Sequence, residues 1–120
     1  MRKIIVAGGR KFQDYEFLER VMDVVVGEDT DIEIVSGTAR GADSMGELYA
    51  QNKGFKLTRF PAKWKEFGRS AGPIRNEEMA EYADELAAFW DGKSTGTKHM
   101  VRYAGKLGLE VRLFFYDDNE

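Results

Sequence analysis

The segment Ile32-Glu33-Ile34-Val35-Ser36-Gly37-Thr38-Ala39-Arg40-Gly41-Ala42-Asp43 decides the fold of this chain. Its first four residues are mostly apolar and predict a strand, and the glycine-rich turn that follows leads into a helical pattern. Glycine in such a turn lets backbone N–H groups approach an anion closely, and the N-terminus of the next helix adds partial positive charge. The segment therefore predicts a strand, an anion-binding turn and a helix in succession.

Two other turns share this arrangement. Ala7-Gly8-Gly9-Arg10 ends the apolar run of residues 4–7, and Asp91-Gly92-Lys93-Ser94-Thr95-Gly96-Thr97 follows the apolar run of residues 86–90. Connections of this kind gather at one edge of a parallel sheet. We therefore expect the three turns to meet and to form a site for a phosphorylated, nucleotide-like molecule.

Strands and helices alternate along the whole chain. Strands are predicted at residues 4–7, 32–35, 55–60, 86–90 and 109–115. Asp14 is expected to cap the first helix, Gly54 to end the second, Pro73 to stand in the first turn of the third and Gly108 to end the last. Apolar residues at helical spacing predict the buried helix faces, which comprise Leu18, Val21, Met22, Val25, Met45, Leu48, Tyr49, Met100, Val101, Ala104 and Leu107.

This alternation predicts the α/β class, with a single Rossmann-like, doubly wound, parallel five-stranded sheet in one domain over residues 1–120. The runs at 4–7 and 86–90 are continuously apolar and belong in the middle of the sheet, whereas the third and fifth strands alternate with polar residues. The predicted strand order is 3-2-1-4-5. In that order the three glycine-rich turns lie at the topological switch point, where open α/β sheets bind ligands.

Composition excludes several classes of site and partner. The chain has no cysteine, so it has neither a disulfide framework nor a thiolate metal site, and no metal or other cofactor is expected. The apolar run at 4–7 is too short for a signal peptide or a membrane span, which favours a cytoplasmic protein without membrane contact. The formal net charge of -3 argues against nucleic acid as a partner, because binding to the phosphate backbone needs a basic face.

Four motifs resemble those of one known family. They are residues 9–12, residues 36–43, Gly72-Pro73-Ile74-Arg75-Asn76-Glu77-Glu78-Met79 and residues 90–97, and they are similar to the motifs of the YspA-type, cpYpsA-related branch of the SLOG superfamily. The resemblance implies a Rossmann-like domain that binds nucleotides or nucleotide-derived molecules, as a sensor or carrier, and that can form a homodimer. None of the turns matches the Walker A sequence or the Gly-x-Gly-x-x-Gly fingerprint.

The residues expected to bind the ligand come from these motifs. The most favoured cations are Arg10, Arg40 and Arg75, since they stand in or beside connections at the same edge of the sheet. Asp43 is open to contact with a ribose or to a structural role in the first turn of its helix, and Asp91 to a role as general base or as the cap of its turn. The expected set is Gly8, Gly9, Arg10, Phe12, Ser36, Gly37, Thr38, Arg40, Gly41, Asp43, Arg75, Asn76, Asp91, Gly92, Ser94, Gly96 and Thr97.

The superfamily also contains the Lonely Guy phosphoribohydrolases, molybdenum-cofactor carriers and a domain of DNA-processing protein A. The hydrolases carry a motif similar to Pro-Gly-Gly-x-Gly-Thr-x-x-Glu, whose glutamate takes part in catalysis. Here Met100 holds that position, and Asn76 stands where those enzymes have lysine. Binding without turnover is therefore the predicted function, hydrolysis of an N-glycosidic or phosphoester bond is the alternative, and no catalytic residue is assigned. A single-stranded DNA module is disfavoured by the net charge.

The connection over residues 63–72 is long for this fold and contains Trp64 and Phe67. Two interpretations stay open: a lid whose aromatic ring stacks on a base, or packing onto the domain or onto a second copy. Trp90 is expected in the core. His99, the only histidine, is predicted to be a poor metal ligand, because neither a cysteine nor a nearby carboxylate accompanies it in the sequence. A surface position in the first turn of the last helix is expected for it instead of a catalytic role.

Overall fold

Five parallel strands form one sheet in the order β3-β2-β1-β4-β5, as the sequence predicts. The computed structural model describes residues 1–117. The strands are β1 (Arg2–Gly8), β2 (Ile32–Ser36), β3 (Lys56–Arg59), β4 (Glu85–Trp90) and β5 (Glu110–Phe115). The helices are α1 (Tyr15–Val26), α2 (Ala42–Lys53), α3 (Trp64–Phe67), the 3-10 turn η1 (Gly68–Ser70), α4 (Ala71–Tyr82) and α5 (Thr95–Lys106).

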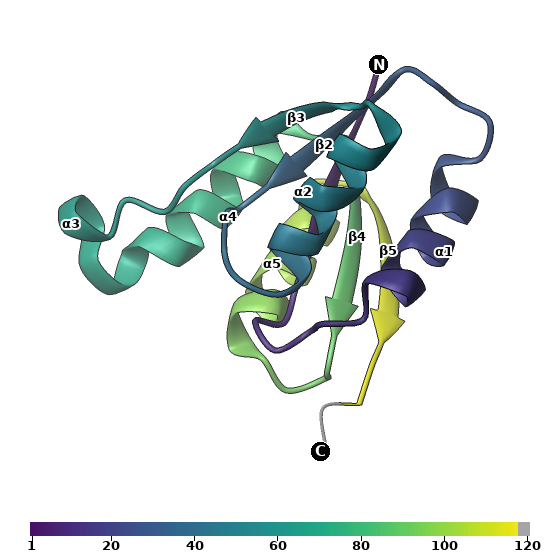
Figure 1. Cartoon of the computed structure of the whole chain (residues 1–120). Coiled ribbons are helices and arrows are strands. Elements are labelled where there is room, and N and C mark those ends of the chain that lie inside the picture. Colours follow the sequence, from purple (N-terminus) through teal and green to yellow (C-terminus); the bar gives the residue numbers. More distant parts are fainter. Residues whose placement is uncertain (118–120) are drawn as a thin grey trace.

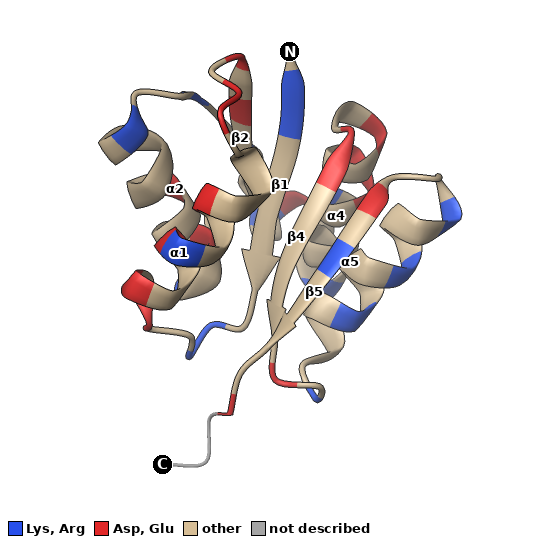
Figure 2. Cartoon of the chain, turned by 90° about the vertical axis from the view of Figure 1, so that its right-hand side faces the viewer, with Lys and Arg blue, Asp and Glu red and all other residues tan. Residues whose placement is uncertain are grey.

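Helices cover both faces of this sheet, so the molecule has three layers. Figure 2 shows α1 and α2 on one face and α4 and α5 on the other. Successive residues of β1 supply the two cores, because side chains alternate across a strand: Ile4 and Val6 belong to the core under α1 and α2, and Ile5 and Ala7 to the core under α4 and α5. This double burial explains why β1 and β4 read as continuous apolar runs.

The predicted helix boundaries at Asp14 and Gly54 are confirmed. Asp14 accepts a hydrogen bond from the backbone N–H of Phe17 at 3.1 Å, and Gly54 ends α2 in the left-handed conformation. Two residues predicted to face inward are instead exposed, Leu48 at 39% and Leu107 at 43%. Leu107 stands at the C-terminal cap of α5, where the helical periodicity no longer applies.

The packing of α2 explains the position of Leu48. Gly46 approaches β1 so closely that a Cβ on it would lie 2.7 Å from the Cβ of Val6. Gly46, Tyr49 and Ala50 therefore form the buried face of α2, and Leu48 turns to solvent. A small residue sets the rotation of this helix, whereas the prediction followed the larger apolar residues.

The long connection after β3 contains helix rather than an extended loop. It forms α3 and η1, and Figure 1 shows α3 projecting beyond the end of β3. Trp64 and Phe67 on α3 are 51% and 40% exposed, so neither ring packs into the core of the domain.

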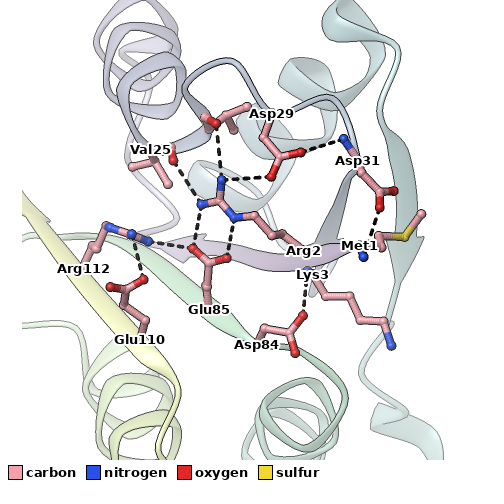
Figure 3. A network of polar contacts seen from close by, with 11 residues as sticks. Met1, Arg2, Lys3, Val25, Asp29, Asp31, Asp84, Glu85, Glu110 and Arg112 are labelled. Carbon is pink, nitrogen blue, oxygen red and sulfur yellow. Dashed lines mark hydrogen bonds and ion pairs between the residues drawn. The ribbon is translucent and has the colours of Figure 1, made fainter.

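A network of charged residues closes the amino edge of the sheet, opposite the glycine-rich turns (Figure 3). Glu85 on β4 accepts hydrogen bonds from Nε and Nη2 of Arg2 at 2.8 and 2.9 Å and from Arg112 at 2.8 Å. The hydrogen bonds from Arg2, with smaller contributions from Arg112, hold the pKa of Glu85 below its ordinary value. The network ties β1, β4 and β5 together where no ligand is expected.

No helix within residues 1–117 has the length and apolar character needed to cross a membrane.

Candidate ligand site

A hollow of about 760 Å³ opens at the carboxyl edge of the sheet, beside the turns that follow β1 and β4. This is the topological switch point of the strand order, where the sequence places the site. Much of the predicted set lines the hollow, namely Gly8, Gly9, Arg10, Asp43, Arg75, Asn76, Asp91, Ser94, Gly96 and Thr97. The structure therefore brings together residues from the first turn, the start of α2, the start of α4 and the third turn.

The first two turns fit against each other through glycine. The carbonyl oxygen of Gly9 accepts a hydrogen bond from the backbone N–H of Ala42 at 3.1 Å. A Cβ on Gly41 would lie only 2.2 Å from that oxygen, and the φ of Gly41 is 75°. Gly41 thus permits the contact between the turns and does not line the hollow itself.

Arg75 and Asp43 lie on either side of Gly37. Nη1 of Arg75 donates to the carbonyl oxygen of Gly37, and Oδ2 of Asp43 accepts from the backbone N–H of Ala39 at 3.1 Å. Burial raises the pKa of Asp43 to about 6, and the hydrogen bond from Ala39 and the charge of Arg75 oppose that shift. Burial likewise lowers the pKa of Arg75, with Asp43 opposing. This pair joins α2, α4 and the second turn.

Asn76 connects the start of α4 with the start of α5. Its Nδ2 donates to the carbonyl oxygen of Gly96 at 3.3 Å and lies 3.3 Å from Nδ1 of His99. Nε2 of His99 lies 3.6 Å from Oε2 of Glu77. His99 is therefore not a plain surface residue: the fold supplies the carboxylate neighbour that the sequence order hides, and the histidine lines the hollow.

The third turn is organised by Asp91. Its Oδ1 accepts hydrogen bonds from the backbone N–H groups of Lys93 and Ser94, each at 2.8 Å. This is the capping role that the sequence left open beside a general-base role. Helix α5 then begins at Thr95, and residues 95–97 all line the hollow, so the positive end of the helix dipole lies at the site.

Aromatic and basic side chains complete the lining. Trp64 of α3 reaches the hollow, and Lys11 and Arg69 line it together with the predicted Arg10. Within residues 1–117, no ion pair or hydrogen bond is formed by the side chains of these three cations. In the same part of the chain, no group of three or more His, Asp or Glu side chains is arranged to hold a metal ion.

Several predicted residues lie away from the hollow. Phe12 is 2% exposed and packs against the rings of Phe89 and Tyr116, with centroid distances of 5.2 and 5.0 Å. The hydroxyl of Ser36 donates to Glu47 at 2.7 Å and accepts from the backbone N–H of Thr38, whose φ is 67°. The predicted residues that do not line the hollow are Phe12, Ser36, Gly37, Thr38, Arg40, Gly41 and Gly92.

A doubly wound parallel sheet in the order 3-2-1-4-5, with helices on both faces, defines a Rossmann-like domain. The chain belongs to the YspA, cpYpsA-related SLOG family, whose sequence profile matches residues 2–67. It is also similar to the Gene 61 protein of Mycobacterium phage D29, with 34% identity over 118 residues that cover 92% of this chain and 94% of that protein.

Two solved structures share the fold. DNA processing protein A from Streptococcus pneumoniae superposes with a TM-score of 0.77 and 19% identity over 94% of this chain, which spans 50% of that protein. DNA processing protein A from Helicobacter pylori superposes with a TM-score of 0.69 and 17% identity over 99% of this chain and 67% of that protein. The Helicobacter structure describes a single-stranded DNA binding mode.

These neighbours correct one prediction. The prediction from the net charge of -3 that nucleic acid is not a partner is wrong, because proteins of this fold include one with a single-stranded DNA binding mode. Net charge averages over the whole surface. Arg10, Lys11 and Arg69 line the hollow without an acidic partner among residues 1–117, so a local basic surface exists on an acidic protein.

Proposed function

We propose that the hollow binds a nucleotide or a nucleotide-derived molecule. One observation carries the proposal: Gly8 and Gly9, the first turn of α5 and the side chains of Arg10 and Arg75 line a single hollow of about 760 Å³. This volume falls within the range of about 300 to 1,000 Å³ that is usual for sites of small molecules and cofactors.

The phosphate of such a ligand fits the side of the hollow formed by α5. Residues 95–97 belong to the first turn of the helix, whose N–H groups have no partner within the helix, and an anion there also gains from the helix dipole. Arg10 and Lys11 line the same hollow and bring positive charge. The expected contact is a charge-assisted set of hydrogen bonds to phosphate oxygens.

The base of the ligand fits against Trp64. The exposed indole ring of Trp64 lines the hollow and offers a flat apolar surface, and every base has a face that can stack on it. Of the two interpretations of the connection over residues 63–72, we therefore propose the lid, whose aromatic ring stacks on the base.

Binding without turnover is the proposed mode, as in a sensor or a carrier. Met100 is 1% exposed and occupies the position of the glutamate that the related hydrolases use, so no carboxylate is offered there. Oδ1 of Asp91 already accepts two backbone N–H groups, which favours a structural role for this carboxylate. The alternative function is hydrolysis of an N-glycosidic or phosphoester bond in the bound molecule.

The test combines a thermal-shift screen with calorimetry on adenine and guanine nucleotides, ADP-ribose and NAD. A ligand at about 100 times its Kd adds roughly 2.7 kcal/mol of stability, which raises the Tm of a small domain by several degrees. Arg10→Gln should weaken binding by about 1.5 to 3 kcal/mol, because it removes a charge-assisted contact. Arg40→Gln is the matched control: Arg40 is also exposed but does not line the hollow, so its affinity should change by less than about threefold.

Two results would overturn the proposal. No Tm shift with any member of the panel would remove the hollow as a nucleotide site. Release of free base or of ribose phosphate from nucleoside monophosphates, above the background without protein, would show that the protein is a hydrolase.

A further inference from the structure

The cations of this protein fall into two groups. Some of them have acidic partners, as in the ion pairs of Lys53 with Asp23 at 3.2 Å and of Arg59 with Glu47 at 3.1 Å. The cations along the exposed face of α5 have none: their side chains make no ion pair and no hydrogen bond to any of the residues 1–117. An uncompensated basic surface on a protein of net charge -3 needs a physical reason.

Lys98, Arg102 and Lys106 form a row along α5, which we call the α5 row. All three are exposed, and no acidic residue occurs between Thr95 and Lys106. Residues four apart in a helix are separated by a rise of about 6 Å, so the three charges follow one another along the same side of the helix. Figure 2 shows blue segments at intervals along the α5 ribbon.

The α5 row is continuous with the candidate site. A shallow hollow of about 350 Å³ lies along the helix and is lined by the three cations together with Thr95, His99 and Tyr103. Thr95 and His99 also line the main hollow, so one surface leads from the site to the far end of α5. The rings of His99 and Tyr103 are nearly parallel, with centroids 6.1 Å apart, and form the wall toward α4.

We propose that this surface binds the sugar-phosphate backbone of a single-stranded nucleic acid, with one nucleotide in the main hollow and the following phosphates on the α5 row. The inference rests on the proposed function, since the main hollow supplies the site for that nucleotide. It extends that function from a free nucleotide to a strand and assigns the backbone contacts to Lys98, Arg102 and Lys106.

The length of the row favours a strand over a free nucleotide. The helix rises about 16 Å between Thr95 and Lys106, so a mononucleotide in the main hollow cannot reach all three cations. Evenly spaced point charges match a polymer of phosphates, and a nucleotide enters a hollow readily only where it is not already paired in a duplex.

Acidic residues on α4 limit where the strand can run. Glu77 lies 3.6 Å from His99, and Oε2 of Glu81 accepts a hydrogen bond from Tyr103 at 3.1 Å. Both carboxylates stand on the α4 side of the two rings, where they repel phosphate. The strand is therefore confined to the outer side of α5, along the row.

The test measures binding of a fluorescently labelled oligo-dT of about twelve nucleotides by anisotropy, over a range of salt concentrations. The variant Lys98→Gln/Arg102→Gln/Lys106→Gln keeps helix-forming residues at exposed positions, so the fold should be retained. Its affinity at moderate salt should fall at least about tenfold, and the slope of log K against log salt should become shallower by about 2, since single strands lose about 0.7 per phosphate contact. The control Arg20→Gln/Lys53→Gln/Arg59→Gln makes the same change in net charge on α1, α2 and β3 and should bind like the wild type.

The readouts separate this inference from the proposed function. Tm shifts with AMP, measured on the same α5 variant, should equal those of the wild type, because the main hollow is unchanged. If AMP binds but oligo-dT binds no better than AMP, or if the α5 variant and the control bind the oligonucleotide equally, the inference fails while the proposed function stands. If neither AMP nor oligo-dT binds, both fail. Equal binding of duplex and single strand would also overturn the assignment, and an RNA strand in a parallel series tells whether the sugar matters.

Discussion

Arg75 and Asp43 approach each other across Gly37 so closely that no side chain fits between them. A Cβ on Gly37 would lie 2.7 Å from Nη1 of Arg75 and 2.8 Å from Oδ2 of Asp43. The arginine comes from α4 and the aspartate from α2, on opposite faces of the sheet. This contact therefore joins the two helical layers at the carboxyl edge, and it depends on a glycine that does not line the hollow.

The buried carboxyl group of Asp43 should make the protein less stable as the pH rises. The pKa of Asp43 is raised from 3.8 to about 6 in the folded protein, so protonation of this carboxyl group stabilises the folded state. This stabilisation is full below pH 3.8 and is lost as the pH rises through 6. Asp43→Asn resembles the protonated form and can still accept from Ala39. The variant should match the wild type near pH 4 and exceed its unfolding free energy by roughly 1 to 3 kcal/mol at pH 7. Urea unfolding from pH 4 to 7.5 measures both.

Lower stability of Asp43→Asn at pH 7 would contradict this prediction. If Asp43→Asn is less stable than the wild type at pH 7, the ionised carboxylate stabilises the fold through Arg75, and burial is not the dominant influence on its pKa.

Alanine substitutions at Gly41 and Gly96 should have opposite effects, because Gly41 is needed for backbone packing and Gly96 for contact with the ligand. A Cβ on Gly41 would lie 2.2 Å from the carbonyl oxygen of Gly9 at a φ of 75°, so Gly41→Ala should cost at least about 2 kcal/mol of stability. A Cβ on Gly96 meets no atom within 4 Å, so Gly96→Ala should leave the stability within about 1 kcal/mol of the wild type. Its affinity for nucleotides should nevertheless fall at least about tenfold, since the methyl group enters the hollow beside the phosphate position.

Unfolding curves and ligand titrations on both variants check this pair. Full affinity in Gly96→Ala would show that this glycine serves only the start of α5.

The strand order was predictable because burial leaves a direct trace in the sequence. β1 and β4 are covered on both faces and are continuously apolar, whereas β3 and β5 stand at the edges and alternate. Glu33 shows the limit of that reasoning. It is 0% exposed, and Oε2 accepts hydrogen bonds from Thr58 and Tyr82, which come from β3 and α4. Partners so distant in the sequence give no local signal.

The candidate site was predictable in its location and less so in its members. Glycine-rich turns mark the carboxyl edge, but a glycine needed by a ligand and one needed by a neighbouring backbone, such as Gly41, look alike in sequence. The contribution of Trp64 depends on where α3 lies relative to the hollow, which only the tertiary structure fixes. For His99 the spacing to Glu77 along the chain is long, while the packing of α4 against α5 brings the two side chains together.

Glu85 should make an acid-sensitive contribution to stability. Its pKa is depressed below 4.5 in the fold, so its contribution is full above pH 4.5 and is lost as the pH falls through the lower value of the folded protein. Glu85→Gln removes the charge that Arg2 and Arg112 share, and the unfolding free energy at pH 7 should fall by about 2 kcal/mol. Denaturant curves at pH 7 and pH 3 measure the effect, which should shrink at the lower pH. Affinity for nucleotides should not change, because the network lies at the opposite edge of the sheet from the hollow. An equal loss at both pH values would assign the effect to side-chain packing instead of charge.

Trp64 should contribute to binding and hardly to stability, and Phe67 on the same short helix supplies the matched control. Both rings are exposed, at 51% and 40%, so Trp64→Ala and Phe67→Ala should each change the unfolding free energy by less than about 1 kcal/mol. Of these two rings, only that of Trp64 lines the hollow. If its indole stacks on a base, Trp64→Ala should weaken nucleotide binding by about 1 to 3 kcal/mol, while Phe67→Ala should bind like the wild type. Stacking also quenches indole fluorescence, so nucleotide addition should lower the emission of the wild type and of Phe67→Ala but not of Trp64→Ala, in which Trp90 is the remaining tryptophan. Quenching that persists in Trp64→Ala would report on Trp90, next to the third turn, and would move the base away from α3 toward the β4 side of the hollow.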